Sequence, residues 1–334
     1  MCKIDQKAIS NLRLVELYCD QNINIYDVNH MADTLKKLEC DNKSSIDQNG
    51  ISKLKLESFT CNGNKNIYDV NHMCDTLEDF ECIFCDFNQK GISELKCLKK
   101  LKCCFSNIND VNHLADTLEV LYCGDFCDIN QNGIMHLKKM KFLNCSYNSQ
   151  IKDVNHMSST LEELVCIGDC GIGQNGISKL KKLKILKCSE NPYINNVNHL
   201  SESLEILHCC GNSGIDQIGV SSLSAIKKII SDKNNKVKPI GTCRYVELYD
   251  SESRTTTFGN IDTICMDFVK QNKYSQKNMH TWKYFYSDHY PKTNVFKNIF
   301  NMIYHGRYHV LTGPFIGSII GGILYYYINK YFAK

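Results

Sequence analysis

Residues 183–191 read Leu-Lys-Ile-Leu-Lys-Cys-Ser-Glu-Asn, and Ile194 follows three residues later. Residues 204–212 return to the same pattern as Leu-Glu-Ile-Leu-His-Cys-Cys-Gly-Asn, with Ile215 three residues later. Both stretches fit the template LxxLxCxxN, in which apolar residues alternate as they do in a strand that is buried on one face. A unit of about 20 residues cannot bury its own apolar face, so repetition of this kind predicts coils that stack on one another.

The template recurs in register ten times, and its cysteines mark the register at intervals of 20 to 22 residues. We call them the ladder cysteines: Cys19, Cys40, Cys61, Cys82, Cys103, Cys123, Cys145, Cys166, Cys188 and Cys209. Two longer phrases alternate from unit to unit, Asp-Val-Asn-His as at residues 27–30 and Gln-Asn-Gly-Ile as at residues 48–51.

This pattern resembles the leucine-rich repeat, with cysteine in place of one core leucine. The resemblance implies an α/β fold over residues 1–238, a curved right-handed stack of about eleven coils with a parallel sheet on its concave side. A degraded eleventh coil at residues 222–238, with Ser231 at the cysteine position, is expected to close the stack as a cap.

Twenty of the 334 residues are cysteine, and whether these are disulfides, metal ligands or free thiols indicates the cell compartment in which the protein folds. Disulfides would scramble along one apolar row, and a single CxxC at Cys82 and Cys85 has no second pair at a zinc-ribbon distance. The register favours reduced thiols that serve as small buried apolar residues, and hence a reducing compartment. The repeated histidines are about 10 Å apart and cannot share an ion, so they are expected to bond to backbone. We expect no metal and no cofactor.

The outward positions of the template carry the candidate contacts with a partner. Its second position alternates in charge and predicts ion pairs between coils, which disfavours nucleic acid: Lys99, Glu119, Lys141, Glu162, Lys184, Glu205 and Lys227. Its fifth position varies, as a surface that recognises a protein partner would. The predicted partner-binding residues are Tyr18, Glu81, Lys102, Tyr122, Val165, Lys187 and His208.

The last part of the chain differs from the repeats. Residues 310–328 contain no charge, and as a helix they reach roughly 28 Å, which predicts a transmembrane tail anchor in the lipid bilayer. Gly313, Gly317 and Gly321 form a small-residue stripe suited to self-association. Residues 239–309 form a polar and aromatic juxtamembrane segment. Residues 233–309 hold twelve Lys and Arg against six Asp and Glu, which places the repeats in the cytosol.

Together these features predict a non-enzymatic protein interaction scaffold held on a membrane by a single span, without a secretory signal peptide. The sequence contains no GxSxG, HExxH, P-loop or GxGxxG motif. One alternative is a soluble adaptor whose last helix caps the solenoid. Another is a cysteine-dependent ubiquitin-ligase-like effector that uses Cys243 and Cys265. The Asn-, Lys- and Ile-rich composition resembles repeat proteins of giant amoebal viruses, which implies a host cell membrane.

Overall fold

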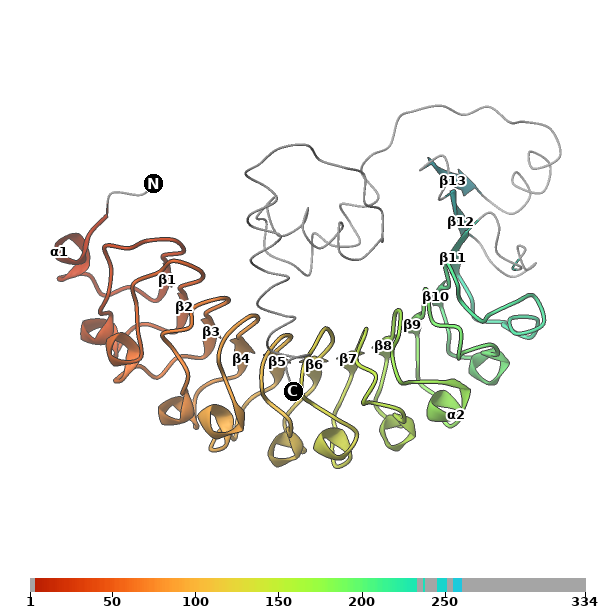
Figure 1. Ribbon diagram of the computed structural model, residues 1–334, viewed down its shortest axis with the longest axis horizontal. Helices are drawn as coiled ribbons and strands as arrows, with labels where there is room; N and C mark the ends of the chain where they lie inside the picture. The colour runs from red at the N-terminus through yellow and green to blue at the C-terminus, as the bar shows by residue number, and fades with distance from the viewer. Residues whose placement is uncertain (1–3, 233–236, 238–244, 251–254, 260–334) are drawn as a thin grey trace, which may run out of the picture. The chain divides into compact units, whose positions relative to one another are not determined.

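The structure is a computed structural model, and it describes residues 4–232, residue 237, residues 245–250 and residues 255–259. Within these residues, thirteen strands form one sheet in which they follow one another in sequence order. The strands of the coils line the inner side of an arc, and short helical turns line its outer side (Figure 1). The predicted solenoid of stacked coils with a strand-lined concave face is therefore confirmed.

Each coil contributes one short strand to the sheet. The first ten strands have three residues each: β1 (Glu16–Tyr18), β2 (Lys37–Glu39), β3 (Ser58–Thr60), β4 (Asp79–Glu81), β5 (Lys100–Lys102), β6 (Val120–Tyr122), β7 (Phe142–Asn144), β8 (Glu163–Val165), β9 (Ile185–Lys187) and β10 (Ile206–His208). Three longer strands follow: β11 (Lys228–Asp232), β12 (Tyr245–Asp250) and β13 (Thr255–Gly259). Neighbours from β1 to β12 pair in parallel, and β13 pairs antiparallel with β12.

The strands pair so that equivalent residues of successive coils lie side by side. Leu164 of β8, for example, pairs with Leu143 of β7 and Leu186 of β9. The middle residue of each short strand points into the core, and the ladder cysteine two residues later points the same way. Cys19 is 5% exposed and the other nine ladder cysteines are 0% exposed, and all ten are free thiols. The predicted buried cysteine ladder is confirmed.

The two repeated phrases form the helical turns on the outer side. The Asp-Val-Asn-His phrases and their Asn-Val-Asn-His relative form η1 (Asn29–Met31), η3 (Asn71–Met73), η5 (Asn112–Leu114), η7 (Asn155–Met157) and η8 (Asn198–Leu200). The second phrase forms α1 (Gln6–Ile9), η2 (Asn49–Ile51), η4 (Gln89–Ile92), η6 (Asn132–Ile134) and α2 (Gln174–Ile177). Its glycine is needed for space, because a Cβ on Gly176 would collide with the backbone carbonyl oxygen of Lys152 in the preceding coil.

The polar residues of these phrases bond from coil to coil. The Nε2 of His72 donates to the carbonyl oxygen of Ile51 at 3.0 Å, and the other four repeat histidines make the equivalent bond. Nδ2 of Asn71 donates to the carbonyl oxygen of Lys90, and its Oδ1 accepts from the N–H of Glu94. The repeat histidines therefore satisfy buried backbone carbonyls, as predicted.

The cap expected at residues 222–238 is not the end of the sheet. Strand β11 pairs in parallel with β12, and β12 pairs with β13, so the sheet continues past the eleventh coil. Ser231, at the position of a ladder cysteine, pairs with Leu248 of β12 and is only 1% exposed. Its hydroxyl has no hydrogen-bond partner within the described residues. The serine is therefore buried between two strands and not at a half-covered edge.

We expect Ser231→Cys to increase the free energy of unfolding by about 1–3 kcal/mol, because a thiol replaces a buried hydroxyl that has no partner. Urea unfolding followed by circular dichroism measures the change. The exposed Ser222→Cys serves as the control and should stay within about 0.5 kcal/mol of the wild type. A lower unfolding midpoint for Ser231→Cys than for the wild type would contradict an apolar, ladder-like environment at this position.

Candidate functional site

Two rows of side chains run along the strand face of the sheet. In each short strand the first and third residues point away from the core, because successive side chains of a strand alternate between its faces. The first residues form the first-position row: Glu16, Lys37, Ser58, Asp79, Lys100, Val120, Phe142, Glu163, Ile185 and Ile206. The third residues form the third-position row: Tyr18, Glu39, Thr60, Glu81, Lys102, Tyr122, Asn144, Val165, Lys187 and His208. All seven predicted partner-binding residues lie in the third-position row.

The half of this face from β2 to β5 carries charges that are already paired. Nζ of Lys102 lies 2.8 Å from Oε2 of Glu81, and these side chains are only 14% and 17% exposed. In the first-position row, Nζ of Lys100 lies 2.7 Å from Oδ2 of Asp79. Glu81 and Lys102, both predicted to bind a partner, therefore bind each other across adjacent strands.

The half of the face from β6 to β10 is largely apolar. We call its apolar side chains the apolar cluster: Val120, Tyr122, Phe142, Val165, Ile185 and Ile206. The ring centroids of Tyr122 and Phe142 lie 4.6 Å apart, and the ring planes make an angle of 34°. Val165 is only 6% exposed, whereas the other five are half-buried. The Val165 side chain is therefore almost completely covered and offers little area to a partner.

Four members of the apolar cluster were not among the predicted contacts. The first-position row corresponds to the third position of the template, and the third-position row corresponds to its fifth position. The prediction used the fifth position alone and therefore left out Val120, Phe142, Ile185 and Ile206. Strand alternation places both positions on one face, so the signal was present in the sequence.

Charged side chains lie inside and beside the apolar cluster, but they are paired. Nζ of Lys187 lies 2.7 Å from Oε1 of Glu163, with side chains 24% and 23% exposed. Nζ of Lys102 lies 5.2 Å from the ring centroid of Tyr122, within the range of a cation–π contact. The cluster thus joins the charged half of the face through Lys102 and presents no isolated charge in its middle.

Two titratable rings of the third-position row, those of Tyr122 and His208, are uncharged at neutral pH. Burial raises the pKa of Tyr122, and the carboxylates of Glu163 and Glu81 raise it further, so the phenol keeps its proton. Burial lowers the pKa of His208 to about 3, and the nearby ammonium groups of Lys187 and Lys228 act in the same direction. His208 therefore offers a partner an uncharged imidazole.

The second template position forms the predicted ion pairs beside these two rows. The paired side chains are Lys36 with Glu57, Glu78 with Lys99, Glu119 with Lys141, Glu162 with Lys184, and Glu205 with Lys227. Their N–O distances run from 2.7 to 3.1 Å. Because each pair joins adjacent coils and cancels its own charge, this border carries no uniform positive field.

Two aspartates, Asp20 and Asp41, each follow a ladder cysteine directly, and a hydrogen bond joins them from coil to coil. The backbone N–H of Asp41 donates to Oδ1 of Asp20, and Oδ1 of Asp41 accepts from the N–H of Asn62. Burial raises the pKa of Asp41 to about 7, the charge of Asp20 adds to the effect, and the hydrogen bond from Asn62 opposes it. Asp41 therefore titrates near neutral pH.

The remaining predicted residues lie outside the described residues. These are the membrane segment 310–328 with Gly313, Gly317 and Gly321, and the two cysteines Cys243 and Cys265. In the part of the chain that the structure describes, no helix has the length and apolar composition needed to cross a bilayer. The same residues hold no group of three or more His, Cys, Asp or Glu arranged to bind a metal ion.

A comparison with solved structures finds matches to this chain. The functional domain of InlJ from Listeria monocytogenes, which includes a cysteine ladder, matches with a TM-score of 0.52 and 19% identity over 75% of this chain and 62% of that one. This chain thus spans less than two thirds of the InlJ structure. An internalin from the same species, InlF, matches with a TM-score of 0.45 and 13% identity over 75% of this chain and 78% of that one.

The complex of yeast Rad7 and Elc1 includes a chain that matches at a TM-score of 0.42 and 15% identity, over 74% of this chain and 83% of that one. No protein-family model matches the sequence, and a search of curated proteins finds no match. At 19% identity, the likeness to InlJ establishes the fold.

We expect Asp41→Asn to flatten the pH dependence of stability. The folded-state pKa of about 7 lies above the unfolded value of about 3.9. The contribution of Asp41 to stability is therefore full below about pH 4 and is lost as the pH rises through 7. An asparagine still accepts the Asn62 N–H, and it carries no charge.

Urea unfolding midpoints at pH 5 and pH 8 test this prediction. The wild type should lose more stability between the two values than Asp41→Asn, and the variant should be the more stable protein at pH 8. The exposed Asp33→Asn is the control and should keep the wild-type profile. Indistinguishable pH profiles for Asp41→Asn and the wild type would contradict a raised pKa for Asp41.

Proposed function

We propose that this chain is a non-enzymatic scaffold that binds a protein partner on the strand face of its solenoid. The observation that carries the proposal is the half-buried pair of Tyr122 and Phe142, with ring centroids 4.6 Å apart, on a strand face where charges such as Lys102 and Glu81 pair with each other. Aromatic side chains supply much of the binding energy at protein interfaces. A rigid sheet positions them in advance, so little conformational entropy is lost when a partner binds.

The chemistry of the face indicates what kind of partner it accepts. Ile185 and Ile206 pair across β9 and β10 and extend the apolar cluster away from the aromatic pair. The neutral border pairs offer no uniform positive charge to phosphates, which disfavours nucleic acid. A protein that presents apolar side chains, with polar groups around them, fits this face best.

We further propose that residues 310–328 hold the scaffold on a membrane as a single span, with the repeats in the cytosol. Support comes from the sequence: nineteen uncharged positions, preceded by an excess of lysine and arginine in residues 233–309. The reduced thiols of the ladder suit a reducing compartment. The stripe of Gly313, Gly317 and Gly321 would support self-association, and the resemblance to giant-virus proteins makes the membrane that of a host cell.

Replacing the aromatic pair tests the proposed binding face. We expect Tyr122→Ala and Phe142→Ala each to weaken partner binding about thirtyfold, since a central aromatic anchor contributes about 2 kcal/mol. The measurement is parallel affinity purification of the wild type and both variants from expressing cells, with quantitative mass spectrometry. A true partner is depleted with both variants.

The matched control for this experiment is Tyr68→Ala, which removes a 56% exposed tyrosine that lies outside the sheet. It should recover the same proteins as the wild type. Recovery of one and the same set of proteins with all four chains would exclude the apolar cluster as the binding face. Circular dichroism of each variant shows whether the solenoid is still folded.

Removal of residues 310–334 tests the membrane tether. We expect the full chain to stay in the membrane fraction after an alkaline wash, because a spanning helix resists extraction. The chain that ends at His309 should move to the soluble fraction with its repeats folded. A full chain that is soluble without detergent would favour the alternative, a soluble adaptor whose last helix caps the solenoid.

A further inference from the structure

Asparagine recurs shortly after the ladder cysteine and joins neighbouring coils. Nδ2 of Asn148 donates to the carbonyl oxygens of Cys123 and Ile129 in the preceding coil, both at 2.9 Å. Asn191 makes the same pair of bonds two coils later, to the carbonyl oxygens of Cys166 and Ile172. In three coils a cysteine takes this position, namely Cys85, Cys127 and Cys170. A thiol has one hydrogen to donate, so these cysteines cannot reproduce the two bonds of the amide.

Each of these cysteines contacts a ladder cysteine of the preceding coil: Cys85 bonds to the carbonyl oxygen of Cys61, and the other two lie sulfur against sulfur. Sγ of Cys170 is 3.7 Å from Sγ of Cys145, and Sγ of Cys127 is 3.7 Å from Sγ of Cys103. The members of the pairs are 25 and 24 residues apart in sequence. A disulfide brings its sulfurs to about 2.05 Å, so each pair must close by about 1.7 Å to form one.

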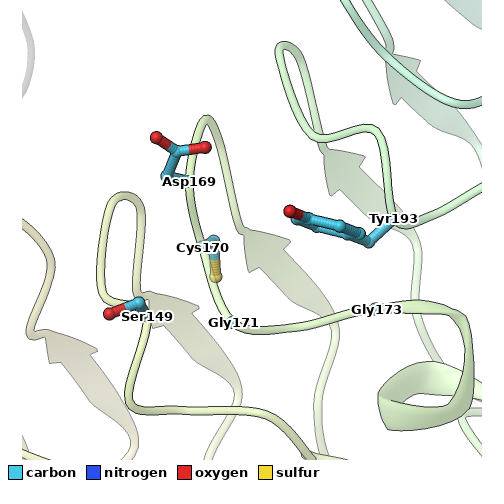
Figure 2. A pocket seen from close by; sticks show the side chains of 6 residues that line it. All are labelled: Ser149, Asp169, Cys170, Gly171, Gly173 and Tyr193. Carbon is cyan, nitrogen blue, oxygen red and sulfur yellow. The ribbon is translucent and has the colours of Figure 1, made fainter.

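One of the pairs lies beneath a surface pocket. The pocket is lined by Ser149, Asp169, Cys170, Gly171, Gly173 and Tyr193 (Figure 2). The carboxylate of Asp169 and the sulfur of Cys170 point in opposite directions, so the acidic group does not cover the thiol. Gly173 has no side chain, and even a Cβ there would come no nearer than 3.4 Å to Tyr193, so this side of the pocket stays open. Cys170 itself is 1% exposed, so this route admits only a small reagent.

We propose that Cys145 and Cys170 form an oxidation-sensitive dithiol that a small hydroperoxide converts into a disulfide between consecutive coils. The sulfur of Cys170 attacks one peroxide oxygen, the O–O bond breaks, and Cys170 becomes a sulfenic acid while the second oxygen leaves as water. The sulfur of Cys145 then attacks the sulfur of Cys170, the S–O bond breaks, and a second water leaves. The two thiols give up two electrons and two protons, and hydrogen peroxide becomes two waters.

The position of each sulfur distinguishes their roles, because Cys170 lines the pocket and Cys145 does not. The hydrogen bond from Cys145 lowers the pKa of Cys170, although burial opposes the effect. The same hydrogen bond, together with burial, raises the pKa of Cys145. These directions agree with the geometry, in which Cys170 meets the peroxide first and Cys145 is the resolving thiol. The product is uncharged, which suits a site where both side chains are at most 1% exposed.

The experiment treats the reduced full-length chain with hydrogen peroxide, blocks the remaining thiols with an alkylating reagent and maps the cysteine peptides by mass spectrometry. The first intramolecular cross-link should join Cys145 to Cys170, with the loss of two titratable thiols. Cys103 and Cys127 have the same sulfur separation but do not line the pocket, so their cross-link should form more slowly. Glutathione disulfide is too large to reach a thiol that is only 1% exposed, so it should react far more slowly than peroxide.

Two variants patterned after neighbouring coils control for folding. Cys170→Asn copies Asn148 and Asn191 and should leave Cys145 free for alkylation after peroxide. Cys127→Ser copies Ser106, whose hydroxyl donates to the carbonyl oxygen of Cys103 at 2.6 Å, and should keep the cross-link of Cys145 with Cys170. The proposal is overturned if Cys170 proceeds to sulfinic acid while Cys145 stays reduced, or if the cross-link forms only in urea.

Discussion

Each coil of this protein rests on a near-copy of itself, so every buried side chain must fit against its own counterpart about 21 residues away. The polar groups meet this constraint in the same way as the apolar ones. Nε2 of Gln48 donates to the carbonyl oxygen of Asp69, and its Oε1 accepts the N–H groups of Tyr68 and Asp69. Because each coil completes the hydrogen bonding of the next, each coil depends on its neighbours for stability.

The ladder cysteines meet the same constraint with apolar side chains. A thiol is small enough to repeat at strand spacing without crowding, and burial keeps the pKa of thiols such as Cys40 and Cys123 well above the ordinary value. These thiols therefore stay protonated and act as core residues. At Cys170 a second cysteine replaces the asparagine that joins neighbouring coils elsewhere. The ladder cysteine Cys145 then has a second sulfur 3.7 Å away, with which it can form a disulfide.

The core and the helical turns are held by repetition, whereas the outward rows of the strand face vary from coil to coil. That face divides into a half of paired charges, exemplified by Lys102 with Glu81, and an apolar half around Tyr122 and Phe142. Pairing removes charges that would otherwise need water, and it leaves the apolar half as the area that a partner can desolvate at low cost. This division is the basis on which we propose a protein partner for the apolar half.

The sequence alone determined the coil length, the inward leucines and cysteines, and the alternating Lys–Glu border, because these follow from a period of two within a strand and from repetition between coils. It also placed all seven predicted contacts on one face. Only the tertiary structure decided that Glu81 is bound by Lys102 and that Val165 is covered, since these depend on side-chain reach between strands. The structure alone also revealed that the sheet continues beyond Ser231. Strand β12 pairs with β11 and β13 pairs with β12, although neither β12 nor β13 carries the repeat template.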